Sequence, residues 1–495
     1  MLLLLLAAAG MTSIISKYRA FLGVGSNLGV RYRNIVQGLE QLCQDGNHTS
    51  LRRTSFFYET APMYVEDQPS FLNAAVEVET TLEPHALLQR LKEIEHDLGR
   101  NFSEIRNGPR PLDLDILLYH HHADNKSGSG NDHGRSIDFQ APYLTIPHPR
   151  IAERDFVLRP LCDITGRDYI LTTNNASSKR ETNDHDQVTT LGQWIDQSPP
   201  TETPPVRVLP LPRNRMIAFR QTIIMGILNV TPDSFSDGGQ FDKSLERAVD
   251  HALQMEKDGA SIIDIGGEST RPGAKEVAIQ EEWQRTVPVI QRIRQVSDIP
   301  ISIDTRHSAV ARAAIEAGAD IVNDVSGGLH DPEMLPTVAK LGVPMVLMHM
   351  RGTPQTMQSM TRYDNGVVQD VAKRLKERME AAEAAGIPRW LQVVDPGIGF
   401  AKDMAGNLSL LKNLRTIRSM VEDAPMLLGT SRKGFIGRIT GLEKAADRDF
   451  GTVASMVGPL CLEGQAVTPT ILRVHNVKAT AEAVKIMDAI KQAPS

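Results

Sequence analysis

Apolar runs and helical spacing alternate along residues 217–495. The apolar residues of 245–253 recur at i, i+3, i+4, i+7 and i+8 and stop before Gly259, which predicts an amphipathic helix. A second helix is expected with Asp331 as N-cap, Pro332 as its first residue and Gly342 at its end. Short β-branched and apolar runs predict strands at 223–230, 260–267, 300–305, 320–327, 344–350, 391–397, 426–431 and 471–476. Eight strands alternating with helices predict a (β/α)8 TIM barrel.

Polar or ionisable residues stand at the ends of these strands. One such residue is usually a cap or turn residue, but in a closed barrel all strand ends meet on one face, where barrel enzymes bind their ligands. The whole set therefore indicates a ligand site. Its members are Asn229, 268–271 with Thr270 and Arg271, Asp304, Asn323, Asp324, His349, Asp395, 431–433 with Ser431 and Lys433, Arg473, His475 and Asn476.

The residue types narrow the ligand class. Asn and Asp suit a heterocycle with alternating donors and acceptors, because a carboxylate accepts two parallel N–H bonds. Arg271, Arg473, His475 and Lys433 are expected to supply the positive charge that a phosphate or diphosphate requires. The small-residue segment 231–239 is a candidate mobile lid.

In the N-terminal part, the segment PRPLDLDILLY (109–119) alternates acids with apolar residues. Residues i and i+2 share one face of a strand, so Asp113 and Asp115 are expected to point together while leucines pack behind them. Such a pair suits Mg²⁺, which completes its shell with substrate phosphates. The alternative is a solvated edge strand. Cations nearby favour phosphoryl-transfer chemistry: Arg100, Arg106, Arg110, His148, Arg150 and Arg154.

Two neighbouring segments bear on the ligand of this part. The glycines of AFLGVGSNLG (20–29) do not have dinucleotide-binding spacing, so a Rossmann fold is disfavoured. Segments 59–64 and 67–80 form an extended, polar and aromatic surface. This surface could sandwich a flat ring between Phe71 and Phe156.

Composition shifts divide the chain. Residues 165–216 are rich in Asn, Thr, Ser and Pro and predict a surface linker, pinned by the apolar piece around Leu191 and Trp194. The island at 120–138 contains histidines and aspartates that could bind metal, but a low-complexity surface insertion is favoured. Residues 1–17 are interpreted as a targeting segment or a disordered tail, and their apolar run is too short to span a bilayer.

Composition is that of an enzyme acting on small molecules. Hydrophobic residues make up 41% and charged residues 23%, which is ordinary globular usage. A net charge of −6 lacks the basic excess of nucleic-acid binders, so neither nucleic acid nor a membrane is expected as partner. Three cysteines without a CxxC pair fit a reducing compartment, either cytoplasmic or mitochondrial.

The barrel motifs resemble those of dihydropteroate synthases. NVTPDSFSDGG, GGESTRPG, SIDT, NDVSGG, DPGIGF, GTSRKGF and RVHNV follow in that order over 220–490. The resemblance implies displacement of pyrophosphate from a pterin CH₂ by the amine of p-aminobenzoate. It implies a Mg²⁺–diphosphate held with help from Asn229, a pterin held by Asp304, Asn323, Asp395 and Lys433, a diphosphate side formed by Thr270, Arg271, Arg473 and His475, and a p-aminobenzoate pocket with Phe400, Ser431 and Lys433.

The N-terminal motifs resemble those of 6-hydroxymethyl-7,8-dihydropterin pyrophosphokinases. GSNLG, DQPxFLNAA, GPRxLDLDI and IPHPR…RxF occur in order over 18–164, and the resemblance implies a ferredoxin-like α+β sandwich. Ala61 and Asn107 depart from the Pro and Trp of many bacterial members. The implied roles are two Mg²⁺ ions on Asp113 and Asp115, pterin contacts from Thr60, Phe71, Asn73 and Phe156, and ATP contacts from Glu95, Arg100, Arg110, His148 and Arg154.

Together the two resemblances imply consecutive steps of folate biosynthesis, with the first domain making the diphosphate that the second consumes. The arrangement is similar to plant and protist bifunctional enzymes rather than three-domain fungal ones. A homo-oligomer through the barrel is expected from the family alone. The alternatives are a pterin-dependent methyl transferase, which the cationic side chains of Lys433, Arg473 and His475 disfavour, and a degenerate pterin-binding module.

Overall fold

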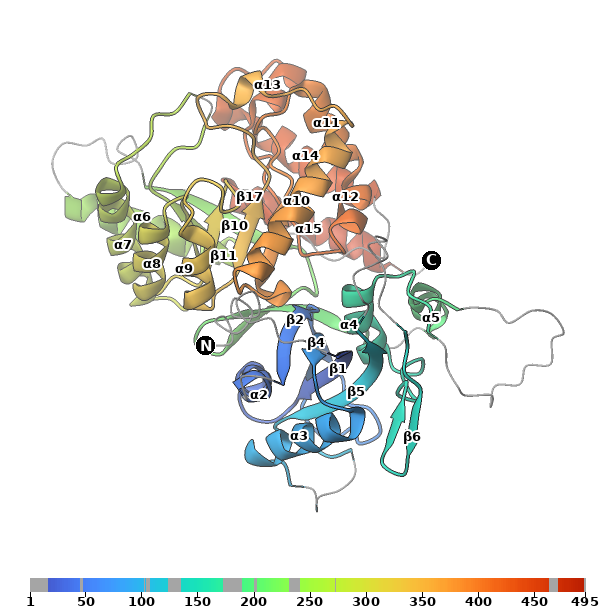
Figure 1. Cartoon of the computed structure of the whole chain (residues 1–495). Coiled ribbons are helices and arrows are strands. Elements are labelled where there is room, and N and C mark those ends of the chain that lie inside the picture. Colours follow the sequence, from blue (N-terminus) through green and yellow to red (C-terminus); the bar gives the residue numbers. More distant parts are fainter. Residues whose placement is uncertain are drawn as a thin grey trace. The chain divides into compact units, whose positions relative to one another are not determined.

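The computed structural model describes residues 17–44, 48–101, 103, 107–122, 135–171, 189–199, 203–230, 241–271, 273–462 and 471–493. It divides into two compact units, described separately below (Figure 1). The first comprises 1–210, 216–218 and 383–390, and the second comprises 211–215, 219–382 and 391–495. Residues 1–16, most of the 120–138 island and the lid candidate 231–239 lie outside the described residues.

The first unit is built on a seven-stranded sheet in the order β5-β1-β4-β3-β8-β9, with β2 pairing β4. β1 runs antiparallel to both β4 and β5. The elements are β1 (Tyr18–Ser26), α2 (Arg31–Gln44), β2 (Thr49–Thr54), β3 (Phe57–Thr60), β4 (Phe71–Thr80), α3 (Pro84–Asp97), β5 (Asp113–His121), β6 (Phe139–Ala141), β7 (Leu144–Ile146), α4 (Asp155–Thr165), α5 (Leu191–Gln197), β8 (Val206–Leu211) and β9 (Arg215–Ala218). The predicted α+β class is confirmed.

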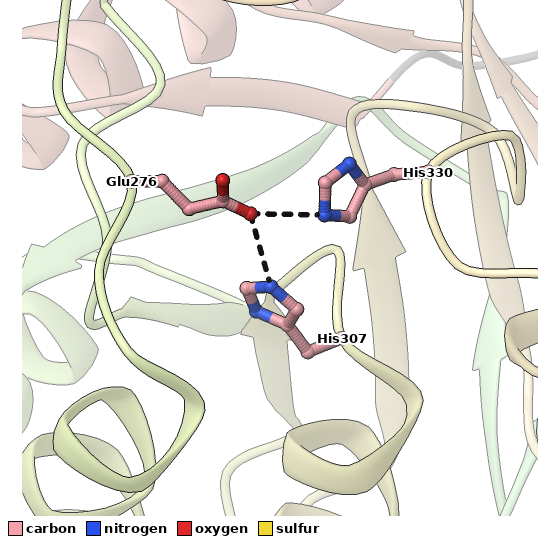
Figure 2. Close-up of side chains that lie close together, drawn as sticks. All are labelled: Glu276, His307 and His330. Carbon is pink, nitrogen blue, oxygen red and sulfur yellow. Dashed lines mark ion pairs between the residues drawn. The ribbon is translucent and has the colours of Figure 1, made fainter.

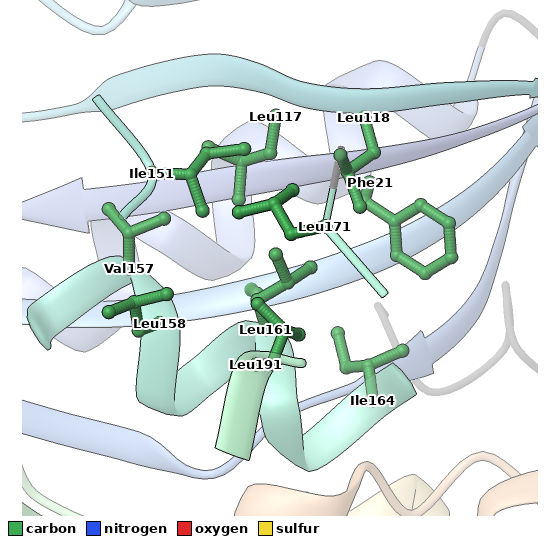
Figure 3. Packing of buried hydrophobic residues seen from close by; sticks show 11 residues of the cluster. Phe21, Leu117, Leu118, Ile151, Val157, Leu158, Leu161, Ile164, Leu171 and Leu191 are labelled. Carbon is green, nitrogen blue, oxygen red and sulfur yellow. The ribbon is translucent and has the colours of Figure 1, made fainter. Parts of the chain in front are cut away.

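A hydrophobic cluster fixes α4 against this sheet (Figure 3). Leu158 and Leu161 of α4 are fully buried with Phe21 of β1 and Leu117 of β5. Burial of such side chains contributes about 1.5–3 kcal/mol each relative to exposure. The cluster thereby joins the helix to β1 and β5, the strands that carry the acidic pair and its glycine neighbours.

The segment predicted as a linker is partly structured. Leu191 of α5 is fully buried in the same cluster, which agrees with the predicted pinning around Leu191 and Trp194. Strand β8, which pairs antiparallel with β3 through residues 206–208, was not predicted. The proline-rich composition hid this strand. Pro210 lies beyond the residues paired with β3, so its missing amide hydrogen costs no hydrogen bond in that ladder.

The second unit is the predicted barrel. Its eight-stranded parallel sheet has the order β15-β14-β13-β12-β11-β10-β17-β16, and a Val394–Met426 bridge joins the two end strands. All eight strands fall inside the predicted segments. They are β10 (Ile223–Asn229), β11 (Ile262–Gly266), β12 (Ile301–Asp304), β13 (Ile321–Asp324), β14 (Met345–Met348), β15 (Gln392–Asp395), β16 (Leu427–Leu428) and β17 (Ile471–Val474).

The helices follow the strands in turn. They are α6 (Phe241–Lys257), α7 (Ile279–Arg294), α8 (Ser308–Glu316), α9 (Met334–Leu341), α10 (Val367–Ala384), α11 (Met404–Lys412), α12 (Leu414–Met420), α13 (Gly434–Thr440), α14 (Asp449–Leu462) and α15 (Val477–Gln492). Helix α9 ends at Gly342 as predicted but begins later than expected. Asp331 instead accepts hydrogen bonds from the amides of Ser308 and Glu333.

Candidate active sites

The acidic pair of the first unit lies on β5 opposite two glycines of β1. Asp113 is in register with Gly25 and Asp115 with Gly23. Leu112 and Leu114 are fully buried, whereas the two carboxylate side chains are 24% and 40% exposed. Alternation on the strand therefore presents both acids on one accessible face, as the sequence predicts.

The two acids have different neighbours. Asp113 Oδ1 lies 2.6 Å from Arg100 Nη1, and its Oδ2 lies 3.4 Å from Arg110 Nη1. Burial alone would raise the pKa of Asp113, but the two arginines outweigh it and lower that pKa. Burial and the charge of Asp113 raise the pKa of Asp115, whose oxygen is 3.9 Å from Lys92 Nζ. The ion pair of Asp115 is therefore longer than that of Asp113, 3.9 Å against 2.6 Å, which suits a metal ion.

Glu95 has a different place from the one its predicted ATP contact suggests. Its side chain is fully buried behind β5. One oxygen accepts hydrogen bonds from Lys92 Nζ at 2.8 Å and from the Leu114 amide at 2.7 Å, and the other lies 2.7 Å from Arg100 Nη1. The Glu95 carboxylate thus fixes two cations and the strand that carries the acidic pair.

The predicted ring-binding residues lie beside the acids. Asn73 Nδ2 donates to Thr60 Oγ1 at 2.8 Å, and a Cβ at Gly25 would come 2.7 Å from Asn73 Oδ1. Gly25 thus serves close packing rather than dinucleotide binding. One cavity of about 410 Å³ is lined by Thr60, Phe71, Asn73, Arg100, Arg110, Asp113, Asp115, His148, Arg154 and Phe156.

Two residues near this cavity, Tyr64 and Lys92, were not predicted as site residues. Tyr64 lines it, and the guanidinium carbon of Arg150 lies 5.0 Å from the Tyr64 ring centroid. Arg154 lies between aromatic rings, 6.0 Å from Tyr64 and 5.7 Å from Phe156. Tyr64 could have been found from the sequence, because it is the aromatic residue of ETAPMY (59–64). No sequence signal pointed to Lys92, because its role depends on contacts with Glu95 and Asp115.

In the barrel, Arg473 of β17 joins two acids from neighbouring strands. Its Nε donates to Asp264 Oδ2 and its Nη2 to Asp304 Oδ2, both at 2.6 Å. Asn323 Nδ2 also donates to Asp264, at 3.2 Å. Burial would lower the pKa of Arg473, but the two carboxylates raise it. Arg473 is therefore a fixed cation held at the barrel mouth.

Asp264 was missed as a site residue. It is fully buried on β11, inside the apolar run IIDIG. An ionisable residue within a buried strand must have a partner, which was the available signal. Burial raises the pKa of its neighbour Asp304 to about 7, although Arg473 opposes the shift.

Lys433 lies against the Phe400 ring and within the electrostatic influence of Asp395. Its ammonium donates to the carbonyl of Ile398 and lies 4.7 Å from the Phe400 ring centroid. Burial lowers the pKa of Lys433 to about 8, opposed by the charge of Asp395. Asp395 itself accepts a hydrogen bond from the Gly397 amide at 2.7 Å. These two predicted pterin-side residues are therefore brought together.

His475 differs from its predicted role as a cation. Burial and the charges of Arg432, Arg473 and Arg271 lower the pKa of His475 to about 3, so its ring is neutral. Ser431 Oγ accepts from the His475 amide at 3.1 Å and lies 2.8 Å from His475 Nδ1. Donation by the Ser431 hydroxyl to Nδ1 leaves Nε2 as a neutral N–H donor.

The remaining predicted residues lie on the same side of the barrel. Asn229 is the last residue of β10, is exposed, and is in register with Gly266. A Cβ at Gly266 would lie 3.9 Å from Asn229 Oδ1 and 3.7 Å from Asp304 Oδ2. Thr270 and Arg271 follow β11, with Thr270 half-buried and Arg271 exposed. Asn229 offers an amide oxygen, a ligand type that fits Mg²⁺.

Fold and site define two pterin-handling enzymes on one chain, and comparisons with known proteins agree. Residues 21–166 match the family model of 7,8-dihydro-6-hydroxymethylpterin-pyrophosphokinase, and residues 225–475 match that of pterin binding enzymes. The chain is 42% identical over 95% of its length to the mitochondrial folate synthesis bifunctional protein of Pisum sativum, covering 88% of that protein. A folate synthesis bifunctional protein of Arabidopsis thaliana is 41% identical, with 95% of each chain covered.

A solved structure agrees for the barrel. The dihydropteroate synthase of Xanthomonas albilineans, determined with 4-aminobenzoic acid, is 42% identical. It matches over 58% of this chain and 100% of its own, with a TM-score of 0.53. The chain belongs to the family of bifunctional folate-synthesis proteins, combining 6-hydroxymethyl-7,8-dihydropterin pyrophosphokinase and dihydropteroate synthase activities. Enzymes of these families use ATP and typically Mg²⁺.

Relatives also bear on location. The Pisum sativum protein and a second Arabidopsis thaliana relative are described as mitochondrial, whereas the Arabidopsis thaliana protein named above carries no such description. Among the described residues, none of the helices combines the length and apolar character needed to cross a membrane.

Proposed function

We propose that Asp113 and Asp115 hold two Mg²⁺ ions with ATP, while Thr60, Phe71, Asn73 and Phe156 hold the pterin alcohol. The main support is that these six residues line one cavity. Bound Mg²⁺ would neutralise negative charge on the transferring diphosphate.

The protein's own groups position the two substrates of this first step. The hydroxyl oxygen of the pterin attacks the β-phosphorus of ATP and loses its proton to solvent, the bond from that phosphorus to the oxygen of the α-phosphate breaks, and AMP leaves. The proposed ATP contacts are Arg100, Arg110, His148 and Arg154. Burial lowers the pKa of His148, which favours a neutral imidazole contact. Glu95 is proposed to position Arg100 rather than to contact ATP.

The barrel is proposed to carry the second step. Asp304, Asn323, Asp395 and Lys433 hold the pterin ring, and Asn229 helps to hold Mg²⁺ with the diphosphate. The bond from the pterin methylene to the diphosphate breaks, the p-aminobenzoate nitrogen bonds to that carbon, and the nitrogen loses a proton. Phe400, Ser431 and Lys433 line the p-aminobenzoate pocket in this proposal, supported by the 4.7 Å contact of Lys433 with Phe400.

The departing diphosphate is the part of the second substrate that gains negative charge. Thr270, Arg271, Arg473 and His475 are proposed to receive it. Arg473 supplies a fixed positive charge, whereas neutral His475 supplies an N–H donor. Preorganised groups of this kind stabilise the transition state because they need no reorientation as charge develops.

The two activities are proposed to divide within 210–219, where the chain passes between the two compact units. Self-association through the barrel is also proposed. Exposed apolar side chains of the contiguous helices α13, α14 and α15 support it, since such patches mark interfaces. They are Ile439, Phe450, Ile486 and Ile490. Light scattering on the full chain should give the mass of an oligomer, and a monomer mass would reject this surface.

Coupled turnover tests the assignment of both steps. Full-length protein given ATP, Mg²⁺ and the pterin alcohol should form AMP, and added p-aminobenzoate should yield dihydropteroate. Supplying the pterin diphosphate directly should make dihydropteroate formation independent of ATP. Formation of dihydropteroate only with ATP present, even when the diphosphate is supplied, would contradict two separate sites.

A further inference from the structure

Three side chains with metal-ligating atoms meet at the barrel face, none of them used in the mechanism above (Figure 2). Glu276 lies between β11 and α7, His307 directly precedes α8, and His330 lies between β13 and α9. Glu276 Oε1 is 3.2 Å from His330 Nε2 and 3.6 Å from His307 Nε2. The ligand atoms of all three residues lie within 4.8 Å of one another.

These distances suit a tetrahedral ion. Zinc bonds to nitrogen and oxygen are about 2.0–2.2 Å long, so tetrahedral ligand atoms lie about 3.3–3.5 Å apart. The two distances from Glu276 bracket that range. The side chains of Glu276 and His330 are 55% and 28% exposed, so they can shift to close the remaining gap and leave a fourth position for water.

A buried carboxylate orients His307 from behind. Glu282 Oε2 lies 2.7 Å from His307 Nδ1, and Glu282 is fully buried. Its other oxygen accepts no hydrogen bond from the residues that the structure describes. Donation from Nδ1–H leaves the Nε2 lone pair facing Glu276. A carboxylate behind a ligating histidine is the usual outer contact of a metal site.

The charge around the two imidazoles also favours a bound cation. Arg306 donates to both oxygens of Glu268. Its Nη1 lies 3.4 Å from His330 Nδ1, and ligation through His330 Nε2 would replace this long contact because Nδ1 would then carry the proton. With Glu276 and Glu282, this connected group holds three carboxylates and one guanidinium. Two negative charges remain uncompensated when both imidazoles are neutral. Glu282 is fully buried whereas Glu276 is 55% exposed, and one divalent ion would balance both charges.

We propose that Glu276, His307 and His330 form a binding site for Zn²⁺ or a similar transition-metal ion, distinct from the Mg²⁺ positions. Two imidazoles and one carboxylate favour such an ion, whereas Mg²⁺ prefers oxygen ligands. The ion would tie together the segments after β11, β12 and β13. This proposal does not depend on the assignment of either reaction.

Cobalt binding tests the site, because Co²⁺ replaces Zn²⁺ and absorbs intensely when four- or five-coordinate. Full-length protein with excess Mg²⁺, which occupies oxygen-rich sites, is titrated with Co²⁺. The unmodified chain should bind one more equivalent of Co²⁺ than the Glu276→Gln or His330→Gln variant. It should also show a visible absorption band that both variants lack. Loss of a ligand should weaken that site at least about 100-fold.

Two matched variants control for general effects. Glu281→Gln and His251→Gln make the same substitutions at exposed positions on α7 and α6 and should bind Co²⁺ like the unmodified chain. Zn²⁺ should raise the unfolding temperature of these three proteins but not of the ligand variants, since only a ligand bound to the native state stabilises it. Equal Co²⁺ binding by all five proteins, or none by the unmodified chain, would overturn the proposal, leaving protonated imidazoles as the balancing charge.

Discussion

The two pterin-handling sites differ in how their carboxylates are paired. In the first unit, Asp115 is 3.9 Å from Lys92, and burial together with Asp113 raises its pKa. In the barrel, Asp264 and Asp304 each receive a 2.6 Å hydrogen bond from Arg473. One site therefore has an acid that is only loosely paired, whereas the other uses its acids to fix a cation belonging to the protein.

This difference follows from the chemistry at each site. In the proposed first step, the dicarboxylate face would bind Mg²⁺ that arrives with ATP, so its charge would be balanced only in the loaded enzyme. Arg473 is in place before substrate binds, because two acids hold its planar guanidinium from different strands. We expect the first site to respond strongly to loss of an acid and the second to loss of a cation.

The largest expected effect is that of Asp115→Ala on the first step. Removing one metal-facing carboxylate should lower the rate of AMP formation about 10²–10³-fold, while dihydropteroate formation from supplied pterin diphosphate is unchanged. Both rates can be measured on one preparation. Asp97→Ala, at an exposed position of α3, is the control and should leave both rates intact. Loss of the second step as well would remove the distinction between the sites.

Lys433→Ala should have the converse effect. Loss of this cation from beside the Phe400 ring should reduce dihydropteroate formation about 100-fold and spare AMP formation. Product analysis after each step checks it. An equal decrease in the rates of both steps would contradict a role of Lys433 in dihydropteroate formation alone.

Gly25→Ala should weaken pterin binding in the first unit. The new Cβ would lie 2.7 Å from Asn73 Oδ1, and overpacking of this kind costs about 1–3 kcal/mol. We expect about a tenfold rise in the Kd of the pterin alcohol, measured by calorimetry. The control is Gly434→Ala, because a Cβ added at Gly434 would meet no atom within 4 Å, and this variant should bind the pterin normally. Gly99→Ala would not serve, because the backbone of Gly99 has a positive φ.

The smallest expected effect is a decrease at high pH in the kcat/KM of dihydropteroate formation, which forms the alkaline limb of its pH profile. Lys433 has a pKa of about 8 in the free protein, lowered chiefly by burial, so it loses its positive charge as pH rises through that value. The kcat/KM of dihydropteroate formation should halve near pH 8 and then fall about tenfold per pH unit. Lys433→Arg should move the limb upward, since guanidinium stays protonated. A limb unmoved by that substitution would assign it to another group.

Much of both sites could be predicted from local pattern. Alternation along 112–116 predicts that Asp113 and Asp115 share a face, and polar residues at the ends of apolar runs mark the barrel mouth. Both inferences need only the periodicity of a strand and the convergence of parallel strand ends. The strand β8 escaped prediction because proline-rich composition outweighed its short alternation.

Other features depend on residues far apart in the chain. Asp264 and Arg473 are separated by 209 positions, and no local pattern says that a buried acid of β11 meets the arginine of β17. The neutral state of His475 likewise depends on burial and on three arginines brought beside it by the fold.

Sequence alone determined the order of strands in the barrel and the chemical type of the residues at the barrel mouth, because strand and helix periods are local properties. Tertiary structure alone decided which charges are paired, which groups are neutral and that Glu276, His307 and His330 share one point. Charge pairing and burial depend on distances in space, and those distances exist only once β11, β12, β13 and β17 have assembled into one sheet.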